Sequence, residues 1–156
     1  DADVLVVVFM CNHCPYVKHI EDELLAVARE YEEKGGQFVG ICSNDPENYP
    51  DDSFDSMAER AQAKDYPFPY LQDESQEVAK TYEAACTPDF YVFDDDRRLM
   101  YRGRFDETRP DDGEPHGGDL RQALDELLDD GTVTMEQKPS MGCNIKWKPG
   151  TKPAHA

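Results

Sequence analysis

The sequence predicts one α/β domain with a mixed β-sheet and helices on both of its faces, a three-layer sandwich. An unbroken apolar run, "VLVVVF" at residues 4–9, is typical of a strand that is buried on both faces. A segment with helical periodicity and a second apolar strand follow it, and a hairpin and a last helix come later. The chain of 156 residues is long enough for one domain with its own core.

The first helix is expected after "MCNHCPYV", where apolar residues recur at spacings of three and four. These residues are Val17, Ile20, Leu24, Val27 and Tyr31. The stripe is that of an amphipathic helix, which Gly35 and Gly36 can close. A second buried strand is expected over residues 37–43.

A second helix is expected over about residues 54–64, with either Ser53 or Asp52 as its cap and Phe54 on the same side as Met57. The following segment, "YPFPYLQD", contains two prolines, which favours a connector or a short edge strand.

The remaining elements have clear start and stop signals. Asp73 followed by Gln76 resembles a capping box for a helix that ends near Ala84. "DFYVFD" and "LMYRGRF" flank "DDRR" and predict a hairpin. Asp119 is expected to cap a last helix, which Gly131 ends.

The composition is strongly acidic, with 16 Lys and Arg against 34 Asp and Glu and a net charge of −18. Such a surface repels nucleic acid and anionic membranes, so neither is expected as a partner. Acid spread along the chain is typical of a protein from a salt-rich cytoplasm, although an ordinary acidic protein is the alternative. We expect a cytoplasmic protein, because the sequence shows neither a signal peptide nor a transmembrane stretch.

The charge divides the chain into a domain, residues 1–131, and a basic C-terminal tail, residues 132–156. The tail carries four lysines and one glutamate, so we expect it to pack on the acidic domain. Because the first strand begins almost directly after Asp1, we also expect an N-terminal extension to be missing.

The stretch "CNHCPY" places two of the five cysteines three residues apart at a strand–helix junction. Cys14 directly precedes Pro15, and proline is favoured in the first turn of a helix. The free N–H groups and partial positive charge of a helix N-terminus stabilise a thiolate, the nucleophilic form of cysteine. His13, if protonated, adds positive charge, and we therefore expect Cys14 to be reactive.

Five segments carry a resemblance to a known family: "FMCNHCPYV", "SND", "DESQEVAKTYEAACTPDFYVFD", "LMYRGRFD" and "GCNIKWKPG". They resemble the thioredoxin superfamily, and within it the thioredoxin-like proteins of the alkyl hydroperoxide reductase/thiol-specific antioxidant group. The resemblance covers nearly the whole chain and implies a thioredoxin-like fold. It also implies that Pro88, in a cis peptide, faces the active cysteine, and that Thr87, Tyr16 and Pro15 shape the substrate groove.

The resemblance allows two registers for the cysteines. If Cys11 and Cys14 form the C-x-x-C pair, Cys11 is the nucleophile and Cys14 the resolving thiol. In thioredoxins, however, the phenylalanine that closes the strand precedes the first motif cysteine by five residues, which matches Phe9 and Cys14. In that register "CPYV" stands where a glutaredoxin has C-P-Y-C, and Val17 replaces the resolving cysteine. We favour Cys14 as the nucleophile and Cys11 as the resolving thiol.

The sequence also departs from the family patterns. The buried aspartate of thioredoxins falls on Val8, so a proton acceptor is missing or His13 takes that role. The threonine and proline of the peroxiredoxin motif are absent, and only Arg102 or Arg104 could replace its peroxide-binding arginine. These departures favour thiol–disulfide exchange over a dedicated peroxidase.

Two further cysteines, Cys86 and Cys143, are candidate resolving or regulatory thiols, with simple packing as the alternative for each. Cys11, His13 and Cys14, completed by Cys86 or Cys143, are also potential metal ligands. Structural zinc sites usually show paired motifs, and only one is present here, so we expect no metal and no cofactor.

We therefore expect a thiol–disulfide oxidoreductase that acts on a protein or small-molecule disulfide and is regenerated by a thiol reductant. One alternative is a peroxiredoxin-like thiol peroxidase with antioxidant activity, in which peroxide oxidises Cys14 to a sulfenic acid. The other is a non-catalytic thioredoxin-fold adaptor or metal carrier, whose cysteines never turn over.

Overall fold

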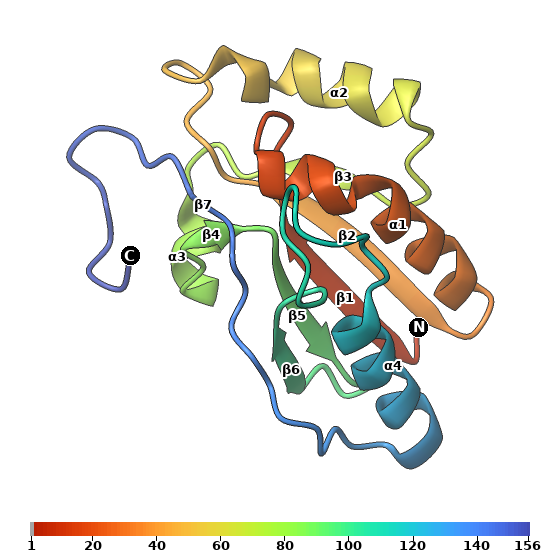
Figure 1. The fold of residues 1–156 in the computed structure, drawn as a ribbon. Helices are drawn as coiled ribbons and strands as arrows, with labels where there is room; N and C mark the ends of the chain where they lie inside the picture. Colours follow the sequence, from red (N-terminus) through yellow and green to blue (C-terminus); the bar gives the residue numbers. More distant parts are fainter. Residues whose placement is uncertain (1) are drawn as a thin grey trace.

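A five-stranded mixed sheet forms the centre of the computed structural model, which describes residues 2–156 (Figure 1). The strand order is β3-β2-β1-β5-β6, with β1, β2 and β3 parallel and with β5 antiparallel to both β1 and β6. The strands are β1 (Val4–Phe9), β2 (Gly36–Cys42), β3 (Tyr70–Gln72), β5 (Asp89–Phe93) and β6 (Leu99–Gly103). The predicted α/β class and the predicted hairpin are confirmed.

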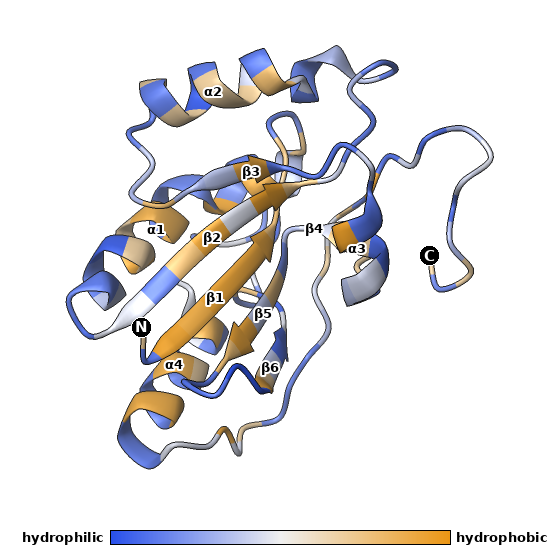
Figure 2. Cartoon of the chain, turned by 180° about the vertical axis from the view of Figure 1, so that it is seen from behind, coloured by the Kyte–Doolittle hydropathy of each residue, from blue (hydrophilic) through white to orange (hydrophobic). Residues whose placement is uncertain are grey.

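The helices are α1 (Pro15–Glu32), α2 (Phe54–Ala63), α3 (Glu77–Tyr82) and α4 (Gly118–Asp130), with a 3₁₀ turn over Pro50–Asp52. Helices α1 and α4 cover one face of the sheet (Figure 1), while the short α3 packs at one end of the opposite face (Figure 2). A separate two-stranded antiparallel sheet joins β4 (Cys86–Thr87) to β7 (Cys143–Asn144) in the tail.

The central strand β1 is buried from both sides, as its unbroken apolar run predicts. Val4, Val6 and Val8 belong to the core cluster beneath α1 and α4. Val7 and Phe9 point the other way, into a second cluster that includes residues of α3 and Ile145 of the tail. The alternation of side chains along a strand therefore divides one hydrophobic run between two cores.

Helix α1 buries the five stripe residues that the periodicity identifies, and its first residue is Pro15. Helix α2 is capped by Ser53, whose Oγ accepts a hydrogen bond from the Ser56 N–H at 3.2 Å. Phe54, expected on the same side as Met57, is 62% exposed, whereas Met57 is buried. Asp52, the other candidate cap, is instead fully buried near the cysteine loop.

The expected capping box of α3 is wrong. Gln76 has left-handed backbone geometry and its side chain donates to the carbonyls of Ser43 and Lys146. Asp73 holds the helix start from outside, because its carboxylate accepts from the N–H groups of Val78 and Ala79, and the Ser75 hydroxyl accepts from the Glu77 N–H. The helix ends at Tyr82 rather than near Ala84, so it is also shorter than expected.

The expected cap of α4 is wrong as well. Gly117 is the residue that precedes the helix, and Asp119 lies inside its first turn, where it pairs with Arg104 at 2.6 Å. Asp106, from the preceding loop, accepts hydrogen bonds from the N–H groups of His116 and Gly117. The end of the helix at Gly131 is as expected.

The tail contacts the body through backbone hydrogen bonds and apolar burial. Ile145 is 3% exposed and Trp147 packs against the same cluster. Among the described residues 2–156, no tail lysine forms an ion pair with an acid of the body. The observed contacts of the tail with the body, over the described residues, are therefore hydrogen bonds and apolar packing rather than ion pairs.

Nowhere along residues 2–156 does a helix combine the length and the apolar character needed to cross a membrane.

A buried ion pair connects α1 to α2 and so fixes the segments on either side of the cysteine loop. Glu21 is 2% exposed, and its carboxylate accepts two hydrogen bonds from Arg60, at 2.7 and 2.8 Å, and one from Tyr66 at 2.6 Å. Burial alone would raise the pKa of Glu21, but the bonds from Arg60 and Tyr66 hold it below its usual 4.5.

Replacing Arg60 by alanine is expected to lower the free energy of unfolding by about 3 kcal/mol at neutral pH. It removes both guanidinium hydrogen bonds from a buried charge and leaves Lys64, 3.5 Å away, as the cationic partner. Since the pKa of Glu21 is lowered, this stabilisation exists above 4.5 and disappears as the pH falls and Glu21 is protonated. Urea unfolding of both proteins across the acidic range measures the difference. The control is Lys34→Ala, at the exposed Lys34–Glu30 pair, which should cost less than about 1 kcal/mol. An equal effect of the two substitutions would contradict the assignment.

Candidate active site

The cysteine loop leaves the central strand and turns directly into α1. Cys14 is the N-cap of the helix, in an extended conformation, and its carbonyl accepts the N–H of Lys18 at 2.9 Å. Pro15 follows at the first helical position and is exposed. The sequence-predicted placement of Cys14 at a helix N-terminus is present in the structure.

The segment before β5 brings Thr87 and Pro88 to both cysteines. The Thr87–Pro88 peptide bond is cis. Sγ of Cys14 lies 3.5 Å from the Thr87 carbonyl oxygen, and Sγ of Cys11 lies 3.6 Å from the Thr87 hydroxyl. Cys11 and Cys14 are 1% and 0% exposed, so the two sulfurs meet beneath the surface.

The environment of Cys14 favours its thiolate. The hydrogen bond from the Cys11 thiol is the largest effect, and those from the Cys143 thiol, the Val17 N–H and Thr87 add to it. Together they outweigh burial, which acts in the opposite direction, and they lower the pKa of Cys14 to about 4. A sulfur that is anionic at neutral pH is the attacking group in thiol–disulfide exchange.

Cys11 has the opposite character. Its hydrogen bond to Cys14 and then its burial raise the pKa of Cys11 far above the usual range, and the charge of Asp52 adds to the effect. Of the two registers that the sequence leaves open, this charge distribution supports the one with Cys14 as the nucleophile.

The remaining cysteines differ in their relation to Cys14. Burial, and then the neighbouring Cys14, raise the pKa of Cys143 in β7 to about 11. Cys86 lies one residue before Thr87 and makes no hydrogen bond to another sulfur among the described residues, and burial raises its pKa to about 12. Cys42, at the end of β2, is buried with a pKa raised to about 12, also by burial.

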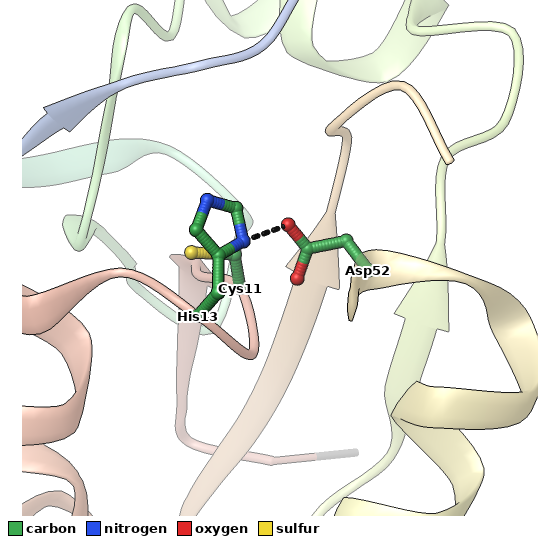
Figure 3. Close-up of side chains that lie close together, drawn as sticks. All are labelled: Cys11, His13 and Asp52. Carbon is green, nitrogen blue, oxygen red and sulfur yellow. Dashed lines mark ion pairs between the residues drawn. The ribbon is translucent and has the colours of Figure 1, made fainter. Parts of the chain in front are cut away.

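His13 lies beside the carboxylate of Asp52, which no spacing in the sequence connects with the site. Nδ1 of His13 is 2.5 Å from Oδ2 of Asp52, and Cys11 is the third member of this group (Figure 3). Asp52 is fully buried, yet its carboxylate accepts the Asn12 N–H at 2.7 Å and the Asn44 side-chain amide at 2.9 Å. These bonds fix the carboxylate close to the cysteine loop.

Asp52 is thus a buried carboxylate beside the cysteine loop, whereas the position of the thioredoxin aspartate falls on Val8. It comes from a different element, the 3₁₀ turn before α2, which explains why an alignment with the first strand does not find it. The only signal in the sequence is an acidic pair, Asp51 and Asp52, next to a helix start, which equally fits a helix cap.

The same group could hold a metal ion. One ligand atom each from Cys11, His13 and Asp52 lies within 4.8 Å of the others. A thiolate, an imidazole and a carboxylate suit zinc or a similar divalent ion. This set differs from the one the sequence suggested, since Asp52 replaces Cys14, Cys86 and Cys143.

A small pocket lies between the start of α1 and Pro88, and no cysteine of the described residues lines it. Tyr16 and Pro88 line it together with Phe105, Met141 and Arg104. Both arginines considered for peroxide binding are paired with carboxylates: Arg104 with Asp119, and Arg102 with Asp89 at 3.3 Å.

The chain belongs to the AhpC/TSA family, which matches residues 1–102. Two solved structures resemble it along most of their length. A conserved uncharacterised protein from Geobacillus kaustophilus is 54% identical with a TM-score of 0.92, and the match covers 96% of this chain and 80% of that one. A hypothetical protein from Sinorhizobium meliloti is 45% identical with a TM-score of 0.93, over 96% and 82% of the two chains.

A more distant structure, a putative thioredoxin from Neisseria meningitidis, is 18% identical with a TM-score of 0.67, over 83% of this chain and 77% of that one. At this identity it shows the fold alone, which is thioredoxin-like. No curated protein matches the chain. The family supports a general redox function, an oxidoreductase, and the predicted resemblance to thioredoxin-like proteins of this group is confirmed.

The site predicts a pH dependence that an ordinary cysteine does not show. With a pKa of about 4, Cys14 should be a thiolate above pH 5, and its signal should disappear only as the pH falls through 4. Ultraviolet absorbance of the thiolate, measured as the difference between wild type and Cys14→Ser, follows this titration. Cys11→Ala removes the largest stabilising hydrogen bond, so its midpoint should move to higher pH. A wild-type midpoint near 9 would contradict the assignment.

Proposed function

We propose that the protein is a thiol–disulfide oxidoreductase in which Cys14 is the nucleophile and Cys11 the resolving thiol. The observation that carries the proposal is that Thr87 holds both buried sulfurs, with Sγ of Cys14 3.5 Å from its carbonyl oxygen and Sγ of Cys11 3.6 Å from its hydroxyl. The neighbouring Cys11 thiol is the largest cause of the lowered pKa of Cys14. The substrate is a protein or small-molecule disulfide, and a thiol reductant regenerates the dithiol.

In the first step the Cys14 thiolate attacks one sulfur of the substrate disulfide. A bond forms between that sulfur and Sγ of Cys14, the substrate S–S bond breaks, and the other sulfur leaves as a thiolate. The negative charge on Cys14 is thereby removed. Because this sulfur is the largest cause of the raised pKa of Cys11, Cys11 becomes easier to deprotonate only after the mixed disulfide has formed.

In the second step Cys11 attacks Sγ of Cys14 and releases the remaining substrate thiol. The proton of Cys11 needs an acceptor. Asp52 is a buried carboxylate with an oxygen within 4.8 Å of the Cys11 sulfur, and it also contacts His13. We assign Asp52 as the proton acceptor for Cys11, with His13 as the group that balances its charge. Thr87 contacts both sulfurs and would position them during the exchange.

A thiol peroxidase is the second candidate, because the chain belongs to the AhpC/TSA family and a low-pKa thiolate also reacts with peroxide. Cys14 would then be oxidised to a sulfenic acid, and Cys11 would condense with it to a disulfide and release water. The pairing of Arg102 and Arg104 with carboxylates favours the disulfide substrate.

Steady-state reduction of a small disulfide tests the proposal. Cys14→Ser should abolish the reaction, and Cys11→Ser combined with Cys143→Ser should block turnover after one equivalent of thiol is released. Asp52→Asn should slow the second step about 100-fold, since it removes the proton acceptor while keeping the shape of the side chain.

The matched control is Cys42→Ala, which removes a buried thiol outside the cysteine loop and should leave the rate unchanged. Faster consumption of hydrogen peroxide than of any disulfide would favour the peroxidase. Stoichiometric metal in the purified protein, with no turnover of either substrate, would favour the metal carrier instead.

A further inference from the structure

Part of the tail, residues 138–148, forms a strap that crosses the backbone of Thr87 and Pro88 and is held on both sides of Cys143. Figure 1 shows this segment running past β6 and β5 to β4. Before the crossing, the Lys138 carbonyl accepts the Arg104 N–H at 3.1 Å, and the Ser140 hydroxyl donates to the Gly103 carbonyl at 2.6 Å. After the crossing, the Ile145 N–H donates to the Ala85 carbonyl at 2.9 Å.

Two polar side chains of the body hold the end of the strap. The Lys146 N–H donates to Oδ1 of Asn44 at 2.8 Å, and the Lys148 N–H donates to Oε1 of Gln76 at 3.1 Å. Gln76 has the left-handed backbone that displaced it from its expected capping role, and its side-chain amide also donates to the Lys146 carbonyl. The strap is therefore fixed by specific contacts at both ends.

Between these anchors the strap touches the backbone beside Cys14. Thr87 is paired with Cys143 in the β4–β7 ladder, so their side chains share one face of that small sheet. Gly142 approaches so closely that a Cβ atom added there would lie 1.9 Å from the Thr87 carbonyl oxygen. Only glycine permits this approach, and the approach sets the position of the next residue, Cys143.

The thiol of Cys143 is consequently held against the reactive sulfur. Both residues adjoin Thr87, since Cys143 is its ladder partner and Sγ of Cys14 lies 3.5 Å from its carbonyl oxygen. Cys143 is half-buried, whereas Cys11 is 1% exposed, so Cys143 is the more accessible of the two thiols that contact Cys14.

We propose that Cys143 is a second redox partner of Cys14: the strap closes the reduced site to bulky disulfides, and a Cys14–Cys143 disulfide fastens the strap in that position. The proposal rests on the proposed function, since it needs a reactive Cys14. It gives the tail a regulatory role, because the strap must be displaced before a large disulfide can reach a sulfur that has no exposed surface.

A small disulfide, RSSR, is the oxidant that forms the Cys14–Cys143 disulfide. The Cys14 thiolate attacks one sulfur, which forms Cys14–S–SR and releases RS⁻. The Cys143 sulfur then attacks Sγ of Cys14, the bond to SR breaks, and the proton of Cys143 passes to the departing sulfur. Two protein thiols are oxidised to one disulfide, and RSSR is reduced to two thiols.

The experiment uses the full chain, reduced and then exposed to one equivalent of bis(2-hydroxyethyl) disulfide, with free thiols blocked and disulfides mapped by mass spectrometry. We expect a Cys14–Cys143 peptide from wild type and from Cys86→Ser, the matched control on the partner strand β4. The peptide should be lost in Cys143→Ser. It should also be lost in Gly142→Ala, which keeps every thiol but pushes the strap away from Thr87.

A second readout follows Cys14 in the reduced proteins with a bulky maleimide. The rate for a buried group follows the population of the open form, so Gly142→Ala should label about tenfold faster or more. Its control is Gly150→Asn, in the same tail, where an added side chain meets nothing and asparagine tolerates the left-handed backbone. Circular dichroism of all variants confirms that they are folded.

The outcomes separate the two proposals. A Cys11–Cys14 disulfide alone in wild type, unchanged in Cys143→Ser and Gly142→Ala, would overturn the strap and leave the proposed function standing. No disulfide of any kind and no released thiol would overturn the proposed function and the strap with it.

Discussion

The negative charge on the Cys14 sulfur has to be stabilised although the residue is fully buried. The contacts around the N-terminus of α1 depend on this constraint. Burial disfavours the charged form, so the charge persists only if donors converge on it. They come from four separate parts of the chain: the loop that carries Cys11, the first turn of α1 with Val17, Thr87 in β4, and the tail with Cys143. Each must be in place for the thiolate to be stable.

The surrounding structure supplies that convergence by connecting segments that are distant in the sequence. The Glu21–Arg60 pair holds α2 to α1, and the turn before α2 presents Asp52 to the cysteine loop. The cis Thr87–Pro88 segment approaches from the other side and contacts both sulfurs. The same segment carries β4, on which the strap is seated. Reactivity and access thus depend on one small set of contacts, which links catalysis to the position of the tail.

The parts of the fold that follow local rules could be predicted from the sequence. The β1 run, the α1 stripe and the placement of Cys14 before Pro15 each depend on neighbours within one element. Gln76 and Asp119 were wrong as cap residues, because distant partners, the tail carbonyl and Arg104, use their side chains instead. Asp52 could not be identified for the same reason: its place beside His13 results from the packing of α2, which no spacing in the sequence reveals.

The proposed mechanism depends most directly on which of the two sulfurs, that of Cys14 or that of Cys11, attacks the substrate disulfide first. Rapid quenching of the wild-type protein with a small disulfide, followed by peptide mass spectrometry within a single turnover, identifies the residue that carries the first mixed disulfide. We predict that the adduct is on Cys14 and that it decays as an intramolecular disulfide to Cys14 appears. An adduct that forms first on Cys11, with Cys14 unmodified, would contradict the account and return the site to the alternative register.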